Sequence, residues 1–196
     1  MANERLERAY QLIDAYNSRD PHTEDVNGVA TPKELLYGQR MTHRMDRYEP
    51  DASEHLKLAA RAQHIGRWEI PRDSYSMDRK GYLQWRSFEK FHHARVIEPI
   101  LREAGYEPET IEKVKFLLLK KELGSNAETQ TLEDVVCLVF IEHYLEEFAS
   151  HHDDDKVADI LRKTMKKMSP RCIKEASNLK VSERIQGLLL KAVGGN

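Results

Sequence analysis

The segment Leu56–Arg86 reads LKLAARAQHIGRWEIPRDSYSMDRKGYLQWR and decides how the chain is interpreted. It begins with the small apolar residues of a buried helix and carries two polar residues, Gln63 and His64, toward the expected interior. The pattern breaks at Gly66, and rigid aromatic rings then alternate with basic side chains. We expect these residues to form the wall of a site. They are Arg67, Trp68, Pro71, Arg72, Tyr75, Tyr82, Trp85 and Arg86.

The length and composition of the chain limit the classes of protein to consider. With 196 residues, 40% of them hydrophobic, and no Pro/Gly-rich divider, the chain is expected to form one domain over residues 1–196. No apolar run approaches the roughly 18 residues that a membrane span requires, and the N-terminus lacks the layout of a signal peptide. The two distant cysteines, Cys137 and Cys172, suit a reducing compartment, so we expect a cytoplasmic protein with Cys137 as a core thiol. A net charge of −2 argues against bulk nucleic-acid binding.

Helical periodicity and helix start signals run along the chain, and no alternating strand pattern is found, so the predicted fold is an all-α helical bundle. Thr31, Pro32 and Glu34 resemble a capping box, and Asp51 with Glu54 repeats that start signal. The predicted core covers about residues 31–150, and outer helices pack on it. The expected helices are residues 3–17, 33–49, 54–66, 78–104 with a bend at Pro99, 108–121, 132–150, 156–168, 170–180 and 182–193.

Several polar residues fall on or near apolar faces of different predicted helices, and buried polar groups need partners. Each has an ordinary structural explanation. Asp134 could cap a helix together with Thr131, His64 could be a satisfied core histidine, and Lys121 could reach solvent along its stem. Together they predict a shared cavity, in which either His92 or His93 takes part. The set is Tyr37, Gln63, His64, His92 or His93, Lys121, Glu133 and Asp134.

The segment AARAQHIGRW resembles the second helix of the HD superfamily, whose pattern there is a His-Asp pair, an apolar residue, glycine and a basic residue. Here Gln63-His64-Ile65-Gly66-Arg67 occupies that frame, YGQRM resembles the first HD helix, and FHHARVIEPILREAGY resembles a later one. The resemblance covers roughly residues 35–150. It implies a helical fold and a site for phosphoester hydrolysis by metal-bound water.

The site residues depart from the HD pattern. Tyr37 and Gln63 stand where the family has histidines, and His64 stands for its first aspartate. Tyrosine and glutamine are poor ligands for a hydrolytic metal, so no cofactor is expected. A divalent metal held by His64, His93 and Asp134, with Glu133 nearby, is the alternative.

A resemblance that covers nearly the whole chain rests on PKELLYGQRM, AARAQHIGRWEIPR, GYLQWR, LEDVVCLVF and KTMKKMS. These blocks are similar to an uncharacterised family of unknown function, sometimes labelled "glutamyl-tRNA synthetase-like". A synthetase catalytic domain needs a nucleotide-binding sheet, for which this chain has no strands, so the label is not carried over.

The basic and aromatic residues instead favour an anionic ligand, because arginine suits phosphate or carboxylate and tryptophan can stack on a ring. We expect a small phosphorylated or nucleotide-like ligand that is bound and perhaps hydrolysed. A non-catalytic scaffold with a fossil site, and a metal-dependent phosphohydrolase with altered ligands, are the alternatives. The predicted catalytic residues are His64, His93, Glu133 and Asp134, and the predicted ligand-binding residues are Tyr37, Gln63, Arg67, Trp68, Arg72, Trp85, Arg86 and Lys121.

Overall fold

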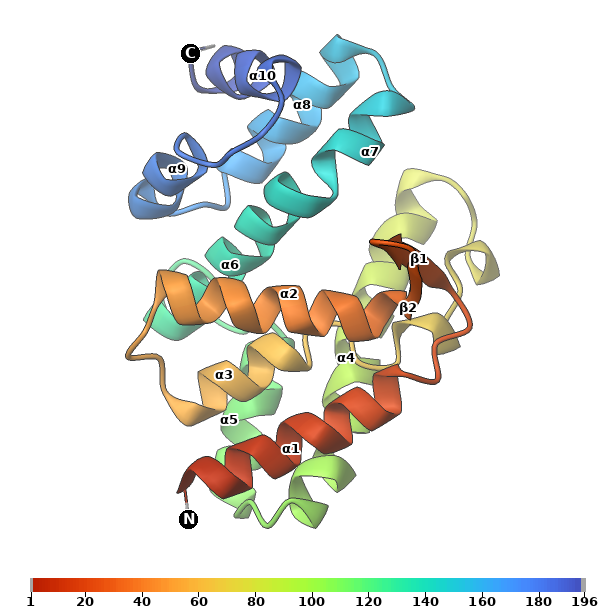
Figure 1. The fold of residues 1–196 in the computed structure, drawn as a ribbon, viewed down its shortest axis with the longest axis vertical. Coiled ribbons are helices and arrows are strands. Elements are labelled where there is room, and N and C mark those ends of the chain that lie inside the picture. Colours follow the sequence, from red (N-terminus) through yellow and green to blue (C-terminus); the bar gives the residue numbers. More distant parts are fainter. Residues whose placement is uncertain (1, 195–196) are drawn as a thin grey trace. The chain divides into compact units, whose positions relative to one another are not determined.

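The computed structural model describes residues 2–194, and the side chains of residues 4–192, as an all-α protein with one small β-hairpin (Figure 1). The chain forms two compact units, Met1–Lys121 and Glu122–Asn196, called here the first and second units. The all-α prediction is confirmed, whereas the single domain stays a prediction. In the first unit the elements are α1 (Ala2–Asn17), β1 (Thr23–Val26), β2 (Val29–Pro32), α2 (Lys33–Tyr48), α3 (Glu54–Arg61), the 3-10 turns η1 (Arg67–Glu69) and η2 (Arg72–Ser74), α4 (Arg79–Glu103) and α5 (Pro108–Leu118).

The core of the first unit lies among α1, α2, α3, α4 and α5, with α3 packed against α1, α2 and α5. In Figure 1, α2 and α3 lie side by side, as their contacts require. Because the buried residues of the short helix α3 are leucines and alanines, its neighbours can approach closely. The loop that follows it is thereby held inside the unit. The fully buried core side chains include Met41, Met45, Leu58, Ile65, Ile97, Leu101, Val114 and Leu118.

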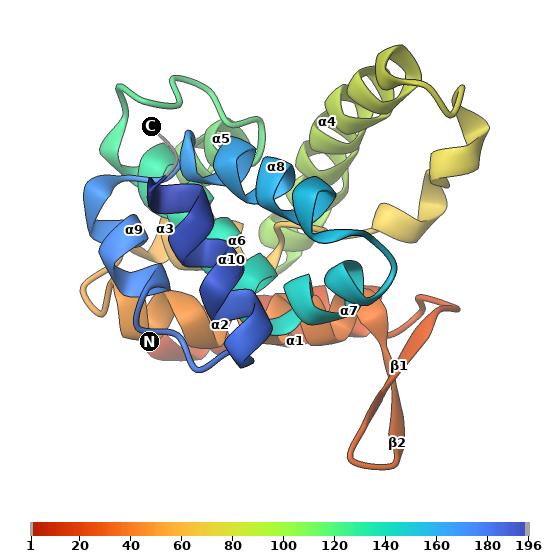
Figure 2. The same ribbon diagram turned by 90° about the horizontal axis from the view of Figure 1, so that it is seen from above.

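The hairpin β1–β2 corrects the expectation of a structureless polar loop before α2. Its strands pair in antiparallel register, with Thr23 opposite Pro32 and Val26 opposite Val29. Asn27 and Gly28 connect them with φ values of 55° and 83°, and such positive values at both positions allow a tight two-residue turn. Figure 2 shows the hairpin projecting from the helices of the first unit. The Asn27-Gly28 pair is itself a sequence signal for such a turn.

The starts of α2 and α3 differ from the predicted caps. Pro32 stands at the N-cap position of α2 without a side-chain cap, and Thr31 belongs to β2. The N-cap of α3 is Ser53, whose hydroxyl accepts a hydrogen bond from the Leu56 amide at 3.2 Å. This helix ends at Arg61, so Gln63 and His64 lie in the turns that follow it rather than on the helix.

The long helix α4 confirms the predicted range closely. Asp78 caps its N-terminus by accepting a hydrogen bond from the Gly81 amide at 2.7 Å, and Pro99 lies inside the helix. The next helix, α5, ends at Leu118, so the prediction that Lys121 continues its apolar face is wrong. Lys120 already has a φ of 53°, which breaks the helix there. Lys121 is exposed, with its ammonium 6.0 Å from the centroid of the Phe116 ring.

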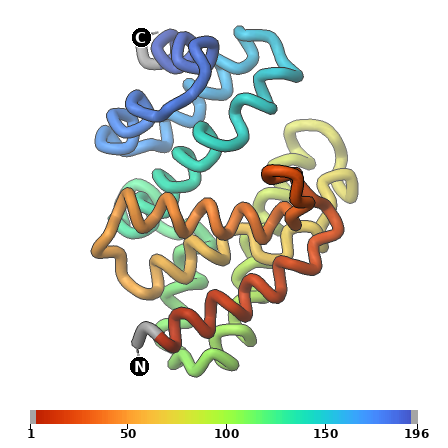
Figure 3. Tube along the Cα trace, viewed as in Figure 1, coloured from red at the N-terminus to blue at the C-terminus, as the bar shows by residue number. Residues whose placement is uncertain are grey.

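The second unit packs α6 against α7 and α9, and α8 against α7 and α10; its path can be followed in Figure 3. The predicted helix over residues 132–150 begins earlier, after the N-cap Asn126, and is divided at Tyr144. Its buried core includes Leu138, Leu161 and Leu189. The elements are α6 (Ala127–His143), α7 (Leu145–Ser150), α8 (Asp154–Met165), α9 (Pro170–Ala176) and α10 (Glu183–Gly194).

Both cysteines are buried and neither forms a disulfide, so the prediction of Cys137 as a core thiol is confirmed. Burial and the nearby Asp134 raise the pKa of the Cys172 thiol, which keeps it protonated. Among the helices within residues 2–194, none has the length and apolar character needed to span a bilayer.

Candidate functional site

His64 lies at the centre of a polar cluster in the first unit. Its ring stacks on Tyr37, with centroids 3.8 Å apart and an 8° angle between the planes. Its Nε2 atom accepts a hydrogen bond from Arg67 Nη1 at 3.0 Å, because a guanidinium can only donate. The proton of the neutral ring therefore sits on Nδ1, which faces Glu34 at 3.3 Å. Burial, with the nearby Arg67 charge, holds the pKa of His64 well below its usual value.

Glu34, in the first turn of α2, and Arg67, on η1, also belong to the cluster. The Arg67 Nε atom lies 3.8 Å from a Glu34 oxygen, and the guanidinium lies 4.6 Å from the centroid of Trp85. Burial raises the pKa of Glu34 to about 8, although the Arg67 charge acts in the opposite direction. Glu34 is thus mostly protonated at neutral pH and leaves much of the Arg67 charge uncompensated.

His93 and Glu89 form a buried pair on α4, one turn apart. The Nδ1 atom of His93 donates to the Ile65 carbonyl at 2.7 Å, so Nε2 faces a Glu89 oxygen at 3.3 Å. Burial lowers the pKa of His93 to about 3 and raises the pKa of Glu89 to about 7. Both Glu89 oxygens are buried without a hydrogen bond among the described residues. At neutral pH the pair therefore favours a neutral imidazole beside a carboxyl group that is about half protonated.

Arg86 brings a second guanidinium to this cluster. It is half-buried on α4, and no side chain within residues 4–192 forms a hydrogen bond or ion pair with it. Its charge nevertheless lowers the pKa of His64, His93 and Glu89. The cluster at neutral pH thus holds two guanidinium charges beside neutral imidazoles, a mostly protonated Glu34 and a Glu89 that is about half protonated.

The sequence left His92 and His93 as alternatives for the cluster. His92 contacts the turn at Gly66. Its Nε2 atom lies 3.1 Å from the Gly66 carbonyl and 3.0 Å from Glu69, while its Nδ1 atom accepts from Arg95 at 3.3 Å. Gly66 has a φ of 69°, and a Cβ atom there would approach His92 Nε2 to 3.0 Å. His93, whose ring centroid is 6.0 Å from that of His64, is consequently the histidine associated with the cluster.

The basic and aromatic segment that follows Gly66 is held largely by its own contacts. Arg72 donates to the carbonyls of Tyr75, Ser76 and Asp78 at 3.2, 2.9 and 3.3 Å, so its guanidinium stabilises the loop before α4. The indole N–H of Trp85 donates to the Ile70 carbonyl at 2.8 Å. A ligand-binding role for Arg72 and Trp85 stays a prediction.

Gln63 and Trp68, two further predicted ligand-binding residues, have different surroundings. Gln63 is buried beside His64, and its Oε1 atom has no hydrogen-bond partner among the described residues. Trp68 lies on η1 with its ring centroid 5.8 Å from that of Tyr16.

Glu133 and Asp134 lie on α6 in the second unit, where both are buried. Asp134 accepts hydrogen bonds from the Gln130 side chain at 2.9 Å and from the backbone and hydroxyl of Ser169 at 2.9 and 2.5 Å. Lys167 lies 3.9 Å from a Glu133 oxygen. These contacts tie Asp134 to the start of α9 rather than to Thr131. The shared cavity and the catalytic roles of both residues stay predictions.

Comparison with protein families places this chain among proteins of unknown function. The family described as "Domain of unknown function (DUF4202)" matches residues 7–189, which is most of the chain. The chain belongs to the DUF4202 family. This confirms the predicted membership of an uncharacterised family, while the resemblance to HD proteins and the synthetase-like label gain no support from it. No curated protein and no solved structure matches.

The DUF4202 chain brings two carboxyl groups, Glu34 and Glu89, to the cluster, and sequence reasoning missed both. Glu34 was interpreted as part of a capping box. Glu89 shares the α4 stripe of Trp85 and His93, with a spacing of four residues on either side, so helical periodicity could have identified it. Among the side chains that the structure describes in this DUF4202 protein, no group of three or more His, Cys, Asp or Glu residues is arranged to hold a metal ion.

Proposed function

We propose that the first unit binds a small phosphorylated or nucleotide-like ligand at the His64 cluster, with Arg67 and Arg86 on its anionic group. The observation that carries this proposal is the pair of guanidinium groups without a fully ionised carboxylate opposite them. Charges in a partly desolvated setting interact more strongly than in water, and the planar guanidinium fork matches phosphate oxygens. An anion would supply the missing negative charge.

The proposal includes a degenerate HD-like origin for this site. Three positions of the HD frame, Tyr37, Gln63 and His64, occur together here, and His93 lies near them. The ligand is held by arginine charge where a metal-dependent enzyme would use metal ions. We propose that this function belongs to the cytoplasm, since two buried cysteines outside any disulfide, Cys137 and Cys172, suit a reducing compartment.

A ligand screen with arginine variants tests the proposal. The intact protein is screened by thermal shift against inorganic phosphate, pyrophosphate, nucleoside mono- and triphosphates and sugar phosphates, and each hit is titrated calorimetrically. We expect Arg86→Met to weaken the binding of a hit about tenfold or more, because a charge-assisted contact contributes roughly 1.5–3 kcal/mol. Arg86 is the sharper position, because no described side chain depends on it.

The matched control is Arg8→Met, which removes an exposed arginine of α1 and should leave Kd within about twofold. Arg67→Met should also weaken binding, although it additionally removes the contact with His64. Equal affinity in wild type and Arg86→Met, or no hit in the panel, would refute anion binding at this cluster. Phosphorus NMR of the same mixtures measures any hydrolysis of the ligand.

A further inference from the structure

The first turns of α4 and the loop before them carry an unusual concentration of exposed apolar side chains. Of the eight large hydrophobic residues that are exposed among those the structure describes, five fall within this one segment. Phe88 and Phe91 are 59% and 65% exposed, and Met77 is 76% exposed. Such clustering is typical of interaction surfaces, whereas single exposed apolar residues are common everywhere. The five residues are Met77, Tyr82, Leu83, Phe88 and Phe91.

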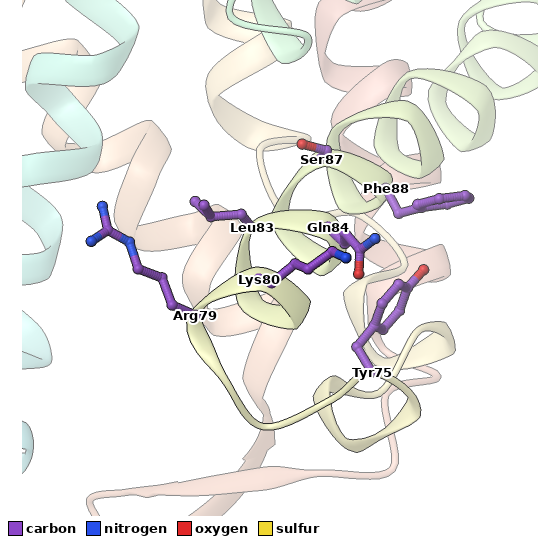
Figure 4. A pocket seen from close by; sticks show the side chains of 7 residues that line it. All are labelled: Tyr75, Arg79, Lys80, Leu83, Gln84, Ser87 and Phe88. Atoms are coloured by element: carbon purple, nitrogen blue, oxygen red, sulfur yellow. The ribbon is translucent and has the colours of Figure 1, made fainter.

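An open pocket of about 700 Å³ lies within this segment, between Tyr75 on the loop and the first turns of α4 (Figure 4). The rings of Tyr75 and Phe88 have centroids 6.0 Å apart with a 48° angle, and Leu83 adds an aliphatic wall. Gln84 and Ser87 supply polar groups at its side. The pocket is open and its lining is mostly apolar, so it has room for an apolar side chain of a partner.

The two charged residues that line the pocket are both basic. Arg79 and Lys80 line the pocket, and Lys90 lies nearly three turns further along α4. None of the three forms an ion pair or side-chain hydrogen bond with a described residue. Within residues 75–91 the two acidic residues are engaged elsewhere. Asp78 caps the helix, and Glu89 is buried on the opposite face beside His93. A partner for this surface should therefore be acidic.

We propose that this surface, the α4 face (Tyr75, Met77, Lys80, Leu83, Phe88 and Phe91), docks an acidic amphipathic helix of a partner protein. One apolar side chain of that helix enters the Tyr75–Phe88 pocket, and flanking carboxylates pair with Arg79, Lys80 and Lys90. A helix laid in an apolar groove presents anchors at i, i+3 or i+4, and i+7, which matches exposed apolar residues spread over three turns.

The aliphatic members of the α4 face distinguish this partner from nucleic acid. Leu83 and Met77 are 55% and 76% exposed, and aliphatic side chains cannot provide the aromatic stacking that single strands use. The concave pocket likewise favours an inserted side chain over a flat bilayer surface. The α4 face is also separate from the ligand proposal, since Trp85, Glu89 and His93 occupy the buried side of the same helix.

A peptide selection tests the docking proposal directly. A phage-displayed library of 16-residue helix-favouring peptides is selected on the intact wild-type protein and counter-selected on a Phe88→Asp/Phe91→Asp variant. We expect enriched peptides to combine apolar residues at helical spacing with an excess of Asp and Glu. The most enriched peptide, synthesised with a fluorophore, should lose at least tenfold in affinity with Phe88→Asp and with Lys80→Glu, measured by fluorescence polarisation.

Leu190→Asp is the matched control, because Leu190 on α10 is 62% exposed and lies outside the α4 face. It should change Kd less than twofold, and circular dichroism should show all variants folded. Enrichment of basic peptides, no enrichment, or equal binding by Phe88→Asp would overturn the proposal. Binding of the wild type, but not of the double variant, to phosphatidylserine vesicles or to a thymidine 20-mer in the absence of peptide enrichment would overturn it in favour of those partners.

Discussion

Asp134 has the polar, buried setting of a catalytic carboxylate, but its hydrogen bonds with Gln130 and Ser169 are those of a structural residue. Its oxygens accept hydrogen bonds from the Gln130 side chain and from the backbone amide and hydroxyl of Ser169. Ser169 is in turn the N-cap residue of α9. Removal of an acceptor leaves buried donors without partners, and this costs more than the bond itself contributes. The role of Asp134 in stability can therefore be tested independently of any ligand.

We expect Asp134→Ala to lower the free energy of unfolding by about 2–4 kcal/mol, measured by urea denaturation. Asp155→Ala serves as the control in the same unit. Asp155 is 91% exposed and pairs with Lys191 at 3.1 Å, so its loss should change stability by less than about 1 kcal/mol. Equal stability of Asp134→Ala and wild type would contradict the structural role.

At the scale of elements, the start of α4 is fixed by a close approach between helix and loop. The Gly81 amide donates to the capping Asp78, and a Cβ atom on Gly81 would lie 2.0 Å from the Ser76 carbonyl oxygen. Arg72 holds the same loop through three carbonyls. Only glycine fits at this contact, so the loop that presents Tyr75 depends on it.

Gly81→Ala should destabilise the protein by about 1–3 kcal/mol, because the loop must move away from the new methyl group. Gly187→Ala on α10 is the opposite case. A Cβ atom there meets nothing within 4 Å, so alanine should stabilise the helix by about 0.5–1 kcal/mol. Urea denaturation measures the free energy of unfolding of both variants. The same sign for the two substitutions would show that the Ser76 contact does not constrain Gly81.

For the whole molecule, the buried ionisable groups of the His64 cluster make stability depend on pH in two directions. The pKa of Glu34 is raised to about 8 and that of Glu89 to about 7, so the folded state binds more protons than the unfolded state above the usual glutamate pKa. The stability that these two glutamates contribute to the folded state therefore falls as pH rises toward those pKa values. The pKa of His93 is lowered to about 3, and that of His64 is also lowered. Below the usual histidine pKa near 6.5 these two histidines therefore make stability rise with pH. The two effects oppose each other below about pH 6.5.

Between about pH 6.5 and 8 only the glutamate effect remains among these groups, so stability should fall as pH rises. Glu34→Gln should flatten this decline and raise stability at pH 8.5 relative to wild type, by an amount on the order of 1–3 kcal/mol after allowance for solvent screening. The measurement is urea denaturation in a pH series. A wild-type profile that rises over this window, or an unchanged slope in Glu34→Gln, would contradict the raised pKa of Glu34.

Most helices of this protein were predictable from the sequence, because local signals specify them. The N-cap Asp78, which accepts from Gly81, marks the start of α4, and Pro108 marks the start of α5. Where two local signals competed, the prediction failed. Thr31 suited a helix cap but pairs in β2, because the Asn27–Gly28 turn favours the hairpin.

The His64 cluster was only partly predictable. His64 and His93 were identified from their placement near apolar faces, and Arg67 and Arg86 from the basic and aromatic segment. The environment of Glu34 was decided by tertiary structure. That residue comes from α2, His64 from the turn after α3 and Glu89 from α4, and packing alone brings such distant segments together. Sequence patterns report which face of a helix is buried, but a pKa depends on every charge and every solvent-excluding atom that the fold places around the group.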